Sequence, residues 1–232
     1  RGGRDSVVIA TKVAKLSTRR GLSAKNLQAA CEDSLSRLQT DYIDLYYAHE
    51  DDPQTPLEET LGAFDSLIKS GKVRYIAASN FTAERLQESL EVSRKNGFAA
   101  YVAAQDQFNL LERDYERTLQ PTLVEKSISQ LPYFGLARGF LTGKYRPGKS
   151  VDSMRAGGMS SYQNERGWAL LSKMDNLAEK YKTTVSAISL AWLRAQPSVA
   201  APIASARNLE QLKEIMPVVE LSTEELQTLT NS

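Results

Sequence analysis

Runs of apolar and β-branched residues alternate along the chain with stretches in which apolar residues recur every three or four positions. The first pattern is typical of buried strands and the second of helices that pack through one face. We predict strands at 7–12, 42–49, 73–80, 101–109, 129–134 and 199–204. Ser23 and Thr55 are predicted helix N-caps, and Pro121 weakens one helix. We predict helices at 24–38, 56–70, 82–95, 112–126, 168–182, 185–195, 208–216 and 223–229.

The order of these elements predicts an α/β fold. Strict alternation means parallel strands joined by crossover helices, either in an open doubly wound sheet or in a closed (β/α)8 TIM barrel. An open nucleotide-binding sheet usually has a Gly-rich turn after its first strand, whereas this chain has Val13-Ala14-Lys15-Leu16 there. We therefore predict the barrel, as a single domain over residues 1–232, with a long loop at 143–158 that is either functional or mobile.

Composition and charge exclude several classes of protein. The 232 residues are 41% hydrophobic and 25% charged, which excludes a disordered or collagen-like chain. The 29 Lys and Arg nearly balance the 28 Asp and Glu, so we expect neither nucleic acid nor a membrane as a partner. No run approaches the roughly 18 apolar residues of a membrane helix. Cys31 is the only cysteine, which excludes an intramolecular disulfide, and we expect a cytoplasmic protein.

Each predicted strand ends in a group that can form hydrogen bonds or ionise. In an α/β barrel the chemistry lies at these carboxyl ends of the strands. The groups are Lys12, His49, Ser79 with Asn80, Gln105 with Asn109, Tyr133, and Ser205 with Arg207.

Each of these residues also has a structural interpretation. Lys12 is either the solvated start of a loop or a charge that lowers the pKa of a neighbouring group. His49, the only histidine, is either a satisfied structural residue or a functional one, and alone it makes a zinc site improbable. The chain has no G-x-S-x-G motif, which argues against a serine hydrolase. We also expect no bound metal. Tyr133 either packs in the core or stacks on a flat ring.

The remaining strand ends have the chemistry of binding groups. Ser79, Asn80, Gln105 and Asn109 are either turn residues or hydrogen-bonding partners for a planar amide. Arg207 is followed by a predicted helix, and an arginine beside a helix N-terminus favours a phosphate. The alternative for Arg207 is an ordinary arginine in a surface loop.

These strand ends, in this order, resemble the aldo-keto reductase superfamily over residues 7–229. The similarity is closest to the branch that contains bacterial and plant reductases and the potassium-channel β subunits. It implies the (β/α)8 barrel and NADPH-dependent reduction of aldehydes or ketones. The segments that carry it are Ile9-Ala10-Thr11-Lys12, 41–49 (DYIDLYYAH), 71–80 (GKVRYIAASN), 105–113 (QDQFNLLER) and 136–145 (LARGFLTGKY).

The resemblance implies a role for each matching residue near the reacting atoms. Lys12 matches the active-site lysine, and His49 matches the histidine that orients the substrate carbonyl. Ser79, Asn80 and Gln105 match the residues that hold the nicotinamide carboxamide.

Other matches bind the rest of the cofactor. Tyr133 matches the aromatic residue that stacks on the nicotinamide ring, and Arg207 suits the 2′-phosphate that distinguishes NADPH from NADH. The diphosphate is lined by Leu136, Gly139 and Lys144, and the adenosine end by Ser205, Arg207, Gln211 and Glu214.

The chain departs from the family pattern at three places. Phe134-Gly135-Leu136 replaces a common Ser-Pro-Leu, and Ile215 replaces a common asparagine at the adenine. The family's proton donor is a tyrosine in an Asp-x-x-x-x-Tyr arrangement upstream of the lysine strand. We therefore expect this chain to supply about six of the eight strand-helix units, to lack the first two, and to have little activity alone.

The leading hypothesis is an NADPH-dependent reductase whose partner is a small carbonyl substrate. One alternative is a nucleotide-binding regulatory subunit with the same fold. Another is a truncated, inactive chain. The sequence does not name the carbonyl substrate or the oligomeric state.

Overall fold

The computed structural model describes residues 3–148 and 160–232. The chain forms two compact units, Arg1–Gln105 with Pro121–Ser129 and Asp106–Gln120 with Gln130–Ser232. Parallel strands alternate with helices along the first unit, so the predicted α/β class is confirmed.

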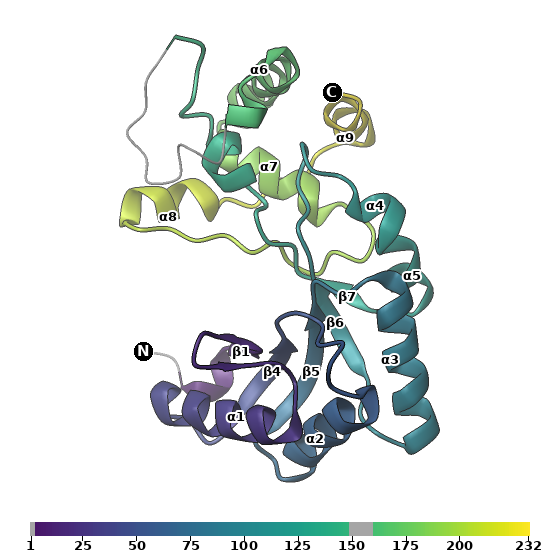
Figure 1. The fold of residues 1–232 in the computed structure, drawn as a ribbon. Coiled ribbons are helices and arrows are strands. Elements are labelled where there is room, and N and C mark those ends of the chain that lie inside the picture. The colour runs from purple at the N-terminus through teal and green to yellow at the C-terminus, as the bar shows by residue number, and fades with distance from the viewer. Residues whose placement is uncertain (1–2, 149–159) are drawn as a thin grey trace. The chain divides into compact units, whose positions relative to one another are not determined.

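The first unit is built on a parallel sheet (Figure 1). Its strands lie in the order β1 (Ala10–Val13), β4 (Ile43–Ala48), β5 (Val73–Ser79) and β6 (Tyr101–Gln105), and β7 (Ser129–Gln130) follows β6. Every residue of β4 is buried, as its apolar run predicts. Because β1, β4, β5 and β6 are parallel, their carboxyl ends share one edge of the sheet.

Among β1, β4, β5 and β6, the bounds of β1 and β6 depart most from the prediction. β1 begins at Ala10 rather than at residue 7, because Val7 and Val8 are 53% and 77% exposed. A short 3-10 helix, η1 (Arg4–Ser6), precedes them. β6 ends at Gln105, and the chain leaves the sheet there.

Three helices lie side by side along one face of this sheet (Figure 1): α1 (Ala24–Leu38), α2 (Leu57–Lys69) and α3 (Ala83–Asn96). The predicted cap of the first is confirmed, because Ser23 accepts a hydrogen bond from the backbone N–H of Asn26. The predicted cap of the second is wrong by one residue. Thr55 instead donates its hydroxyl to Asp52, and Pro56 takes the N-cap position.

The single helix predicted at 112–126 is two short helices, α4 (Tyr115–Thr118) and α5 (Gln120–Glu125). They are interrupted at Leu119. Pro121 has no backbone N–H, so it is tolerated in the first turn of α5 but not in the middle of a longer helix.

A hairpin that the sequence pattern did not indicate follows β1. It consists of β2 (Lys15–Leu16) and β3 (Arg19–Arg20), paired in antiparallel fashion. The backbone N–H of Gly21 donates to the carbonyl of Ala14 at 3.1 Å and closes the base of the hairpin.

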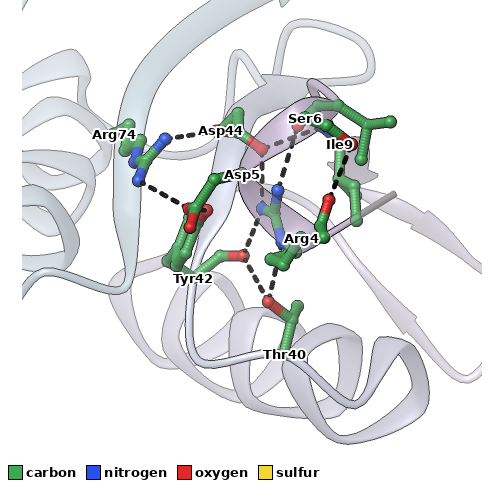
Figure 2. A network of polar contacts seen from close by, with 10 residues as sticks. Arg4, Asp5, Ser6, Ile9, Thr40, Tyr42, Asp44 and Arg74 are labelled. Atoms are coloured by element: carbon green, nitrogen blue, oxygen red, sulfur yellow. Dashed lines mark hydrogen bonds and ion pairs between the residues drawn. The ribbon is translucent and has the colours of Figure 1, made fainter. Parts of the chain in front are cut away.

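A polar network anchors the start of the described chain to β4 and β5 (Figure 2). The Asp44 carboxylate accepts hydrogen bonds from Arg4 at 2.6 Å, from the backbone N–H of Ile9 at 2.9 Å and from Arg74 at 2.9 Å. The Tyr42 ring has both guanidinium groups 3.9 Å from its centroid. The network therefore fixes the entry of β1 into the sheet at the end opposite to the polar strand ends.

The second unit is mainly helical. Residues 186–193 of α7 are all buried, so this helix forms the centre of the unit's apolar core. Its other long helix, α6, packs against α7 and α9. Besides α4, its helical elements are η2 (Ala137–Thr142), η4 (Ser160–Tyr162), α6 (Glu165–Lys180), α7 (Val185–Arg194), α8 (Leu209–Ile215) and α9 (Thr223–Thr230).

The two predicted strands of this part are corrected. Of 129–134 only Ser129–Gln130 is a strand, because Pro132 lacks the N–H that a ladder needs. Residues 199–204 form no strand, and only Val199 makes an isolated bridge, to Gln130. Pro202 again removes a donor, and residues 203–205 are exposed.

Of the predicted long loop at 143–158, residues 149–158 lie outside the described residues. Among the helices that the structure describes, none is both long and apolar enough to cross a membrane.

Candidate functional site

Five of the predicted site residues meet at the carboxyl edge of the sheet in the first unit. Lys12 lies on β1, His49 follows β4, Ser79 ends β5, Asn80 follows it and Gln105 ends β6. We call these five residues the strand-end set.

Lys12 connects β1 with β6 at this edge of the sheet. Its ammonium donates a hydrogen bond to Oε1 of Gln105, although the two residues are 93 positions apart. Burial lowers the pKa of Lys12, and the charge of Lys15 lowers it further. The lysine is thus a half-buried cation held at a defined place, and the interpretation of a solvated loop residue is wrong.

His49 is held by its backbone and kept neutral by its surroundings. Its N–H donates to the carbonyl of Val13 at 3.0 Å, so the strand pairing continues to this residue. Burial lowers the pKa of His49, the charges of Lys12 and Lys15 lower it further, and Glu50 opposes them. A neutral imidazole at pH 7 has one ring N–H that can donate to a carbonyl oxygen.

The remaining three residues bond to one another. Ser79 Oγ donates to the carbonyl of Gln105 at 2.7 Å. Asn80 Nδ2 donates to the carbonyl of His49 at 2.9 Å and to Ser79 Oγ at 3.0 Å. Asn80 has a φ of 58°, in the left-handed region that asparagine tolerates better than most residues. The sheet therefore delivers a hydroxyl and two amides to one place.

Tyr47 belongs to this site and was missed from the sequence. It pairs in register with Lys12, whose Nζ lies 5.2 Å from the Tyr47 ring centroid. The hydroxyl is buried, which raises the pKa of Tyr47, and a hydrogen bond with the side chain of Gln105 opposes this rise. The sequence contains a signal for Tyr47, because this residue precedes His49 by two positions in a predicted strand. Residues two positions apart in a strand share a face.

A second group of predicted residues lies in the second unit. Tyr133 is half-buried, with its ring edge toward Phe134 at a centroid distance of 5.1 Å. Leu136 accepts a hydrogen bond from the backbone N–H of Gly139 at 2.8 Å. Gly139 has a φ of 105°, and a Cβ there would lie 3.9 Å from Nζ of Lys144. Bare backbone and an exposed ammonium thus lie side by side.

The residues predicted to contact the adenosine end of the cofactor lie on an exposed stretch of the chain. We call residues 199–216 the 199–216 segment. The backbone N–H of Arg207 donates to Oε1 of Gln211 at 2.9 Å, and Asn208 caps α8. The carbonyl of Glu214 accepts a hydrogen bond from Thr184 at 2.5 Å. The side chains of Ser205, Arg207 and Glu214 are exposed.

Asn109 is a turn residue rather than a part of the strand-end set. It is fully buried, and its Oδ1 accepts hydrogen bonds from the backbone N–H groups of Leu111 and Glu112 at 2.9 and 3.0 Å. Its Nδ2 donates to the carbonyl of Phe134 at 3.0 Å. Within residues 3–148 and 160–232, no group of three or more His, Cys, Asp or Glu is placed to hold a metal ion.

The chain is similar to known proteins over most of its length. The family model described as "Aldo/keto reductase family" matches residues 1–232. "Uncharacterized oxidoreductase YrpG" of Bacillus subtilis is 34% identical over 227 residues, which cover 94% of this chain and 69% of that protein. "Putative voltage-gated potassium channel subunit beta" of Schizosaccharomyces pombe is 32% identical over 230 residues, covering 94% of this chain and 67% of that protein.

A solved structure is also similar. The crystal structure of the thermostable aldo-keto reductase Tm1743, in complex with the inhibitor epalrestat, has a TM-score of 0.79 and 29% identity. The match covers 99% of this chain and 73% of that one, and it is consistent with the predicted TIM barrel. This chain spans 60% to 69% of the length of four curated relatives.

Proposed function

Because the chain belongs to the aldo/keto reductase family, we propose that its residues reduce an aldehyde or a ketone to an alcohol, with NADPH as the hydride donor. The family and the oxidoreductases among its relatives support carbonyl oxidoreductase chemistry in general. The observation that carries the specific proposal is the strand-end set, in which Lys12 reaches Gln105 beside His49.

The residues fit a nicotinamide dinucleotide in their chemistry. A carboxamide has one acceptor and two donors, and Ser79, Asn80 and Gln105 offer hydroxyl and amide groups that can match them. A diphosphate needs cations and accessible backbone, and Lys144 beside Gly139 supplies both. The hydroxyl of Tyr47 is a further buried polar atom in the layer of Lys12.

Within this proposal the strand-end set holds the nicotinamide end and prepares the carbonyl group. When bound, NADPH supplies the hydride that adds to the carbonyl carbon. His49, neutral at pH 7, donates a hydrogen bond to the carbonyl oxygen and so fixes the face of the substrate that is presented. Lys12 stabilises the negative charge that develops on that oxygen and lowers the pKa of a nearby proton donor.

The residues of the second unit bind the rest of the cofactor in this proposal. Tyr133 stacks on the nicotinamide ring. Leu136, Gly139 and Lys144 contact the diphosphate. Ser205, Arg207, Gln211 and Glu214 contact the adenosine end. Arg207 selects NADPH over NADH, because an arginine binds the extra 2′-phosphate through charge and paired N–H groups.

We also propose a cytoplasmic location. Cys31 is buried and free, which suits a reducing compartment.

The proposal is tested by two measurements on the 232-residue chain. The first is the affinity for NADPH, followed by the fluorescence of the reduced nicotinamide. The second is aldehyde-dependent oxidation of NADPH with a panel of aromatic and aliphatic aldehydes. Binding with turnover supports a reductase. Binding without turnover is expected of a nucleotide-binding regulatory subunit, which the similarity to a channel β subunit also suggests, and of a truncated, inactive chain. Absence of binding overturns the proposal.

A further inference from the structure

The hairpin after β1 is fixed in place beside the strand-end set. Its base is closed at Ala14, which has a φ of 101° although it is not a glycine. A Cβ on Gly21 would lie 2.6 Å from Oδ2 of Asp52, and the backbone N–H of Leu22 donates to the same atom at 2.8 Å. Strained backbone that is held by its surroundings is concentrated at functional sites.

The hairpin brings two cations together. Lys15 and Arg20 are register partners, so their side chains leave the same face of the ladder at directly opposite positions. Like charges at such a position destabilise a ladder. Arg19 occupies the adjacent position on the other face, and its guanidinium pairs with Asp33. Lys15 and Arg20 are thus placed together on one face of the hairpin, and Arg19 is on the other.

Lys15 lies close to the reacting end of the proposed site, and Arg20 is its register partner. Nζ of Lys15 is 3.0 Å from Oε2 of Glu50, the residue after His49. After burial, the charge of Lys15 is a cause of the lowered pKa values of both Lys12 and His49. Lys15 therefore lies within electrostatic reach of the groups that are proposed to hold the carbonyl.

The acidic residues nearby leave room for an anion. The Lys15 and Glu50 side chains are 41% and 39% exposed, and such surface pairs contribute little to stability. Glu50 can therefore give up Lys15 to a ligand at small cost. Of the next two carboxylates, Asp51 is bound by Arg85 and Asp52 by backbone N–H groups.

We propose that Lys15 and Arg20 form a subsite for an anionic group carried by the carbonyl substrate, such as a carboxylate. This inference rests on the proposed function, because it names the substrate class of that site. A bound carboxylate removes the repulsion between the two cations and accepts hydrogen bonds from both.

The test uses the full chain and a matched pair of ligands, 4-(hydroxymethyl)benzoate and the uncharged 4-(hydroxymethyl)benzamide. Their dissociation constants are measured by titration calorimetry with and without saturating NADP⁺. The variants are Lys15→Met and Arg20→Met. The control is Arg19→Met, which removes a cation from the same hairpin but from its other face. Circular dichroism confirms that each variant is folded.

We expect the benzoate to bind at least about tenfold more tightly than the benzamide, a difference typical of a charged hydrogen bond. Lys15→Met and Arg20→Met each remove most of this preference, and Arg19→Met retains it. Equal affinity of the two ligands, loss of the preference in Arg19→Met, or no binding of either ligand overturns the inference.

Turnover separates this inference from the proposed function. The corresponding aldehydes, 4-carboxybenzaldehyde and 4-formylbenzamide, are assayed with NADPH. If both aldehydes are reduced at equal KM, the reductase stands and the subsite is rejected. If neither is reduced but the benzoate preference follows Lys15 and Arg20, the subsite stands and the reductase is rejected.

Discussion

The strand-end set and the 199–216 segment supply opposite ends of the proposed cofactor site, and they are built in different ways. In the strand-end set, Ser79 and Gln105 are 1% and 5% exposed, and Lys12 bonds across 93 positions of sequence. In the 199–216 segment the side chain of Arg207 is exposed, and its backbone bonds to Gln211, only four residues away. The geometry of the strand-end set therefore depends on the whole sheet. The geometry of the 199–216 segment around Arg207 depends on one helix cap.

This difference separates chemistry from recognition. Reacting groups must be held within a fraction of an ångström, and a parallel sheet does so by fixing the register of its strands. A phosphate on a long ligand tolerates more freedom, so an exposed arginine on a locally capped loop suffices. Substitutions in the strand-end set are therefore expected to change turnover, and substitutions in the 199–216 segment to change affinity alone.

The largest expected effect is on turnover. Lys12→Met removes the cation that stabilises the developing negative charge, so the rate of aldehyde-dependent NADPH oxidation falls at least about 100-fold. The dissociation constant of NADPH stays within about twofold, because Lys12 contacts no cofactor group in the proposal. Lys95→Met, at an exposed position of the same unit, is the control and keeps the wild-type rate. An equal rate in Lys12→Met and wild type contradicts the assigned role.

A second prediction concerns the acid stability of the second unit. Burial raises the pKa of Glu225, but hydrogen bonds from Lys180, Tyr181 and Ser222 lower it to about 2. A carboxyl group whose pKa is lower in the folded protein than in the unfolded chain stabilises the fold at pH values above the unfolded pKa of 4.5. This stabilisation is lost as the pH falls toward 2.

The size of the Glu225 effect is about 2–3 kcal/mol. Urea unfolding at pH 7 is expected to show Glu225→Gln destabilised by about this amount, and the difference from wild type shrinks as the pH falls below 4.5. A difference that is the same at pH 7 and pH 3 excludes the linkage. A confirmed effect shows that the unit that carries the 199–216 segment is anchored by hydrogen bonds between α6 and α9.

Third in size is the effect of the 2′-phosphate on affinity. We expect Arg207→Ala to raise the dissociation constant of NADPH about tenfold, because one charged hydrogen-bonding partner is lost. The constant for NADH is expected to change less than about twofold. Lys213→Ala, which removes another cation from α8, is the control. Equal weakening of both cofactors would reject the phosphate assignment.

The smallest expected effect is a difference in stability between two variants of Asn80. It distinguishes the contribution of the side-chain amide from that of the backbone conformation. Asn80→Ala and Asn80→Gly both remove the amide that bonds to His49 and Ser79. Only glycine adopts the φ of 58° without strain, so Asn80→Gly is expected to be about 1 kcal/mol more stable than Asn80→Ala. Thermal unfolding measures this difference. If NADPH binds the two variants with unequal affinity, backbone strain rather than the amide controls binding.

Much of the first unit was predictable from sequence. The apolar runs of β4 and β5 and the helix cap at Ser23 are local signals, and the structure confirms them. Once the strands are parallel, their polar ends must share an edge, so the meeting of Lys12 with Gln105 followed from topology. Tyr47 was not predicted, because it lies inside β4 rather than at its end, although it shares a face with His49.

The second unit was harder to predict because prolines interrupt its patterns. Pro132 and Pro202 lie within apolar runs that otherwise indicate strands, and each removes a ladder donor. The hairpin at Lys15–Arg20 was not predicted either. Its two-residue strands are too short and too polar to show an alternation of apolar and polar residues. Helix α8 was predicted within one residue, because Asn208 is a strong N-cap.

We propose that the strand-end set and the 199–216 segment both take part in binding a nicotinamide dinucleotide. Hydrogen–deuterium exchange of the full chain with and without NADPH tests it most directly. We predict slower exchange in peptides that cover 136–144 and 203–212, and a smaller slowing at 79–81, where buried hydrogen bonds already protect the backbone. Slowing that spares either the strand-end set or the 199–216 segment, or no slowing at all, would contradict the claim.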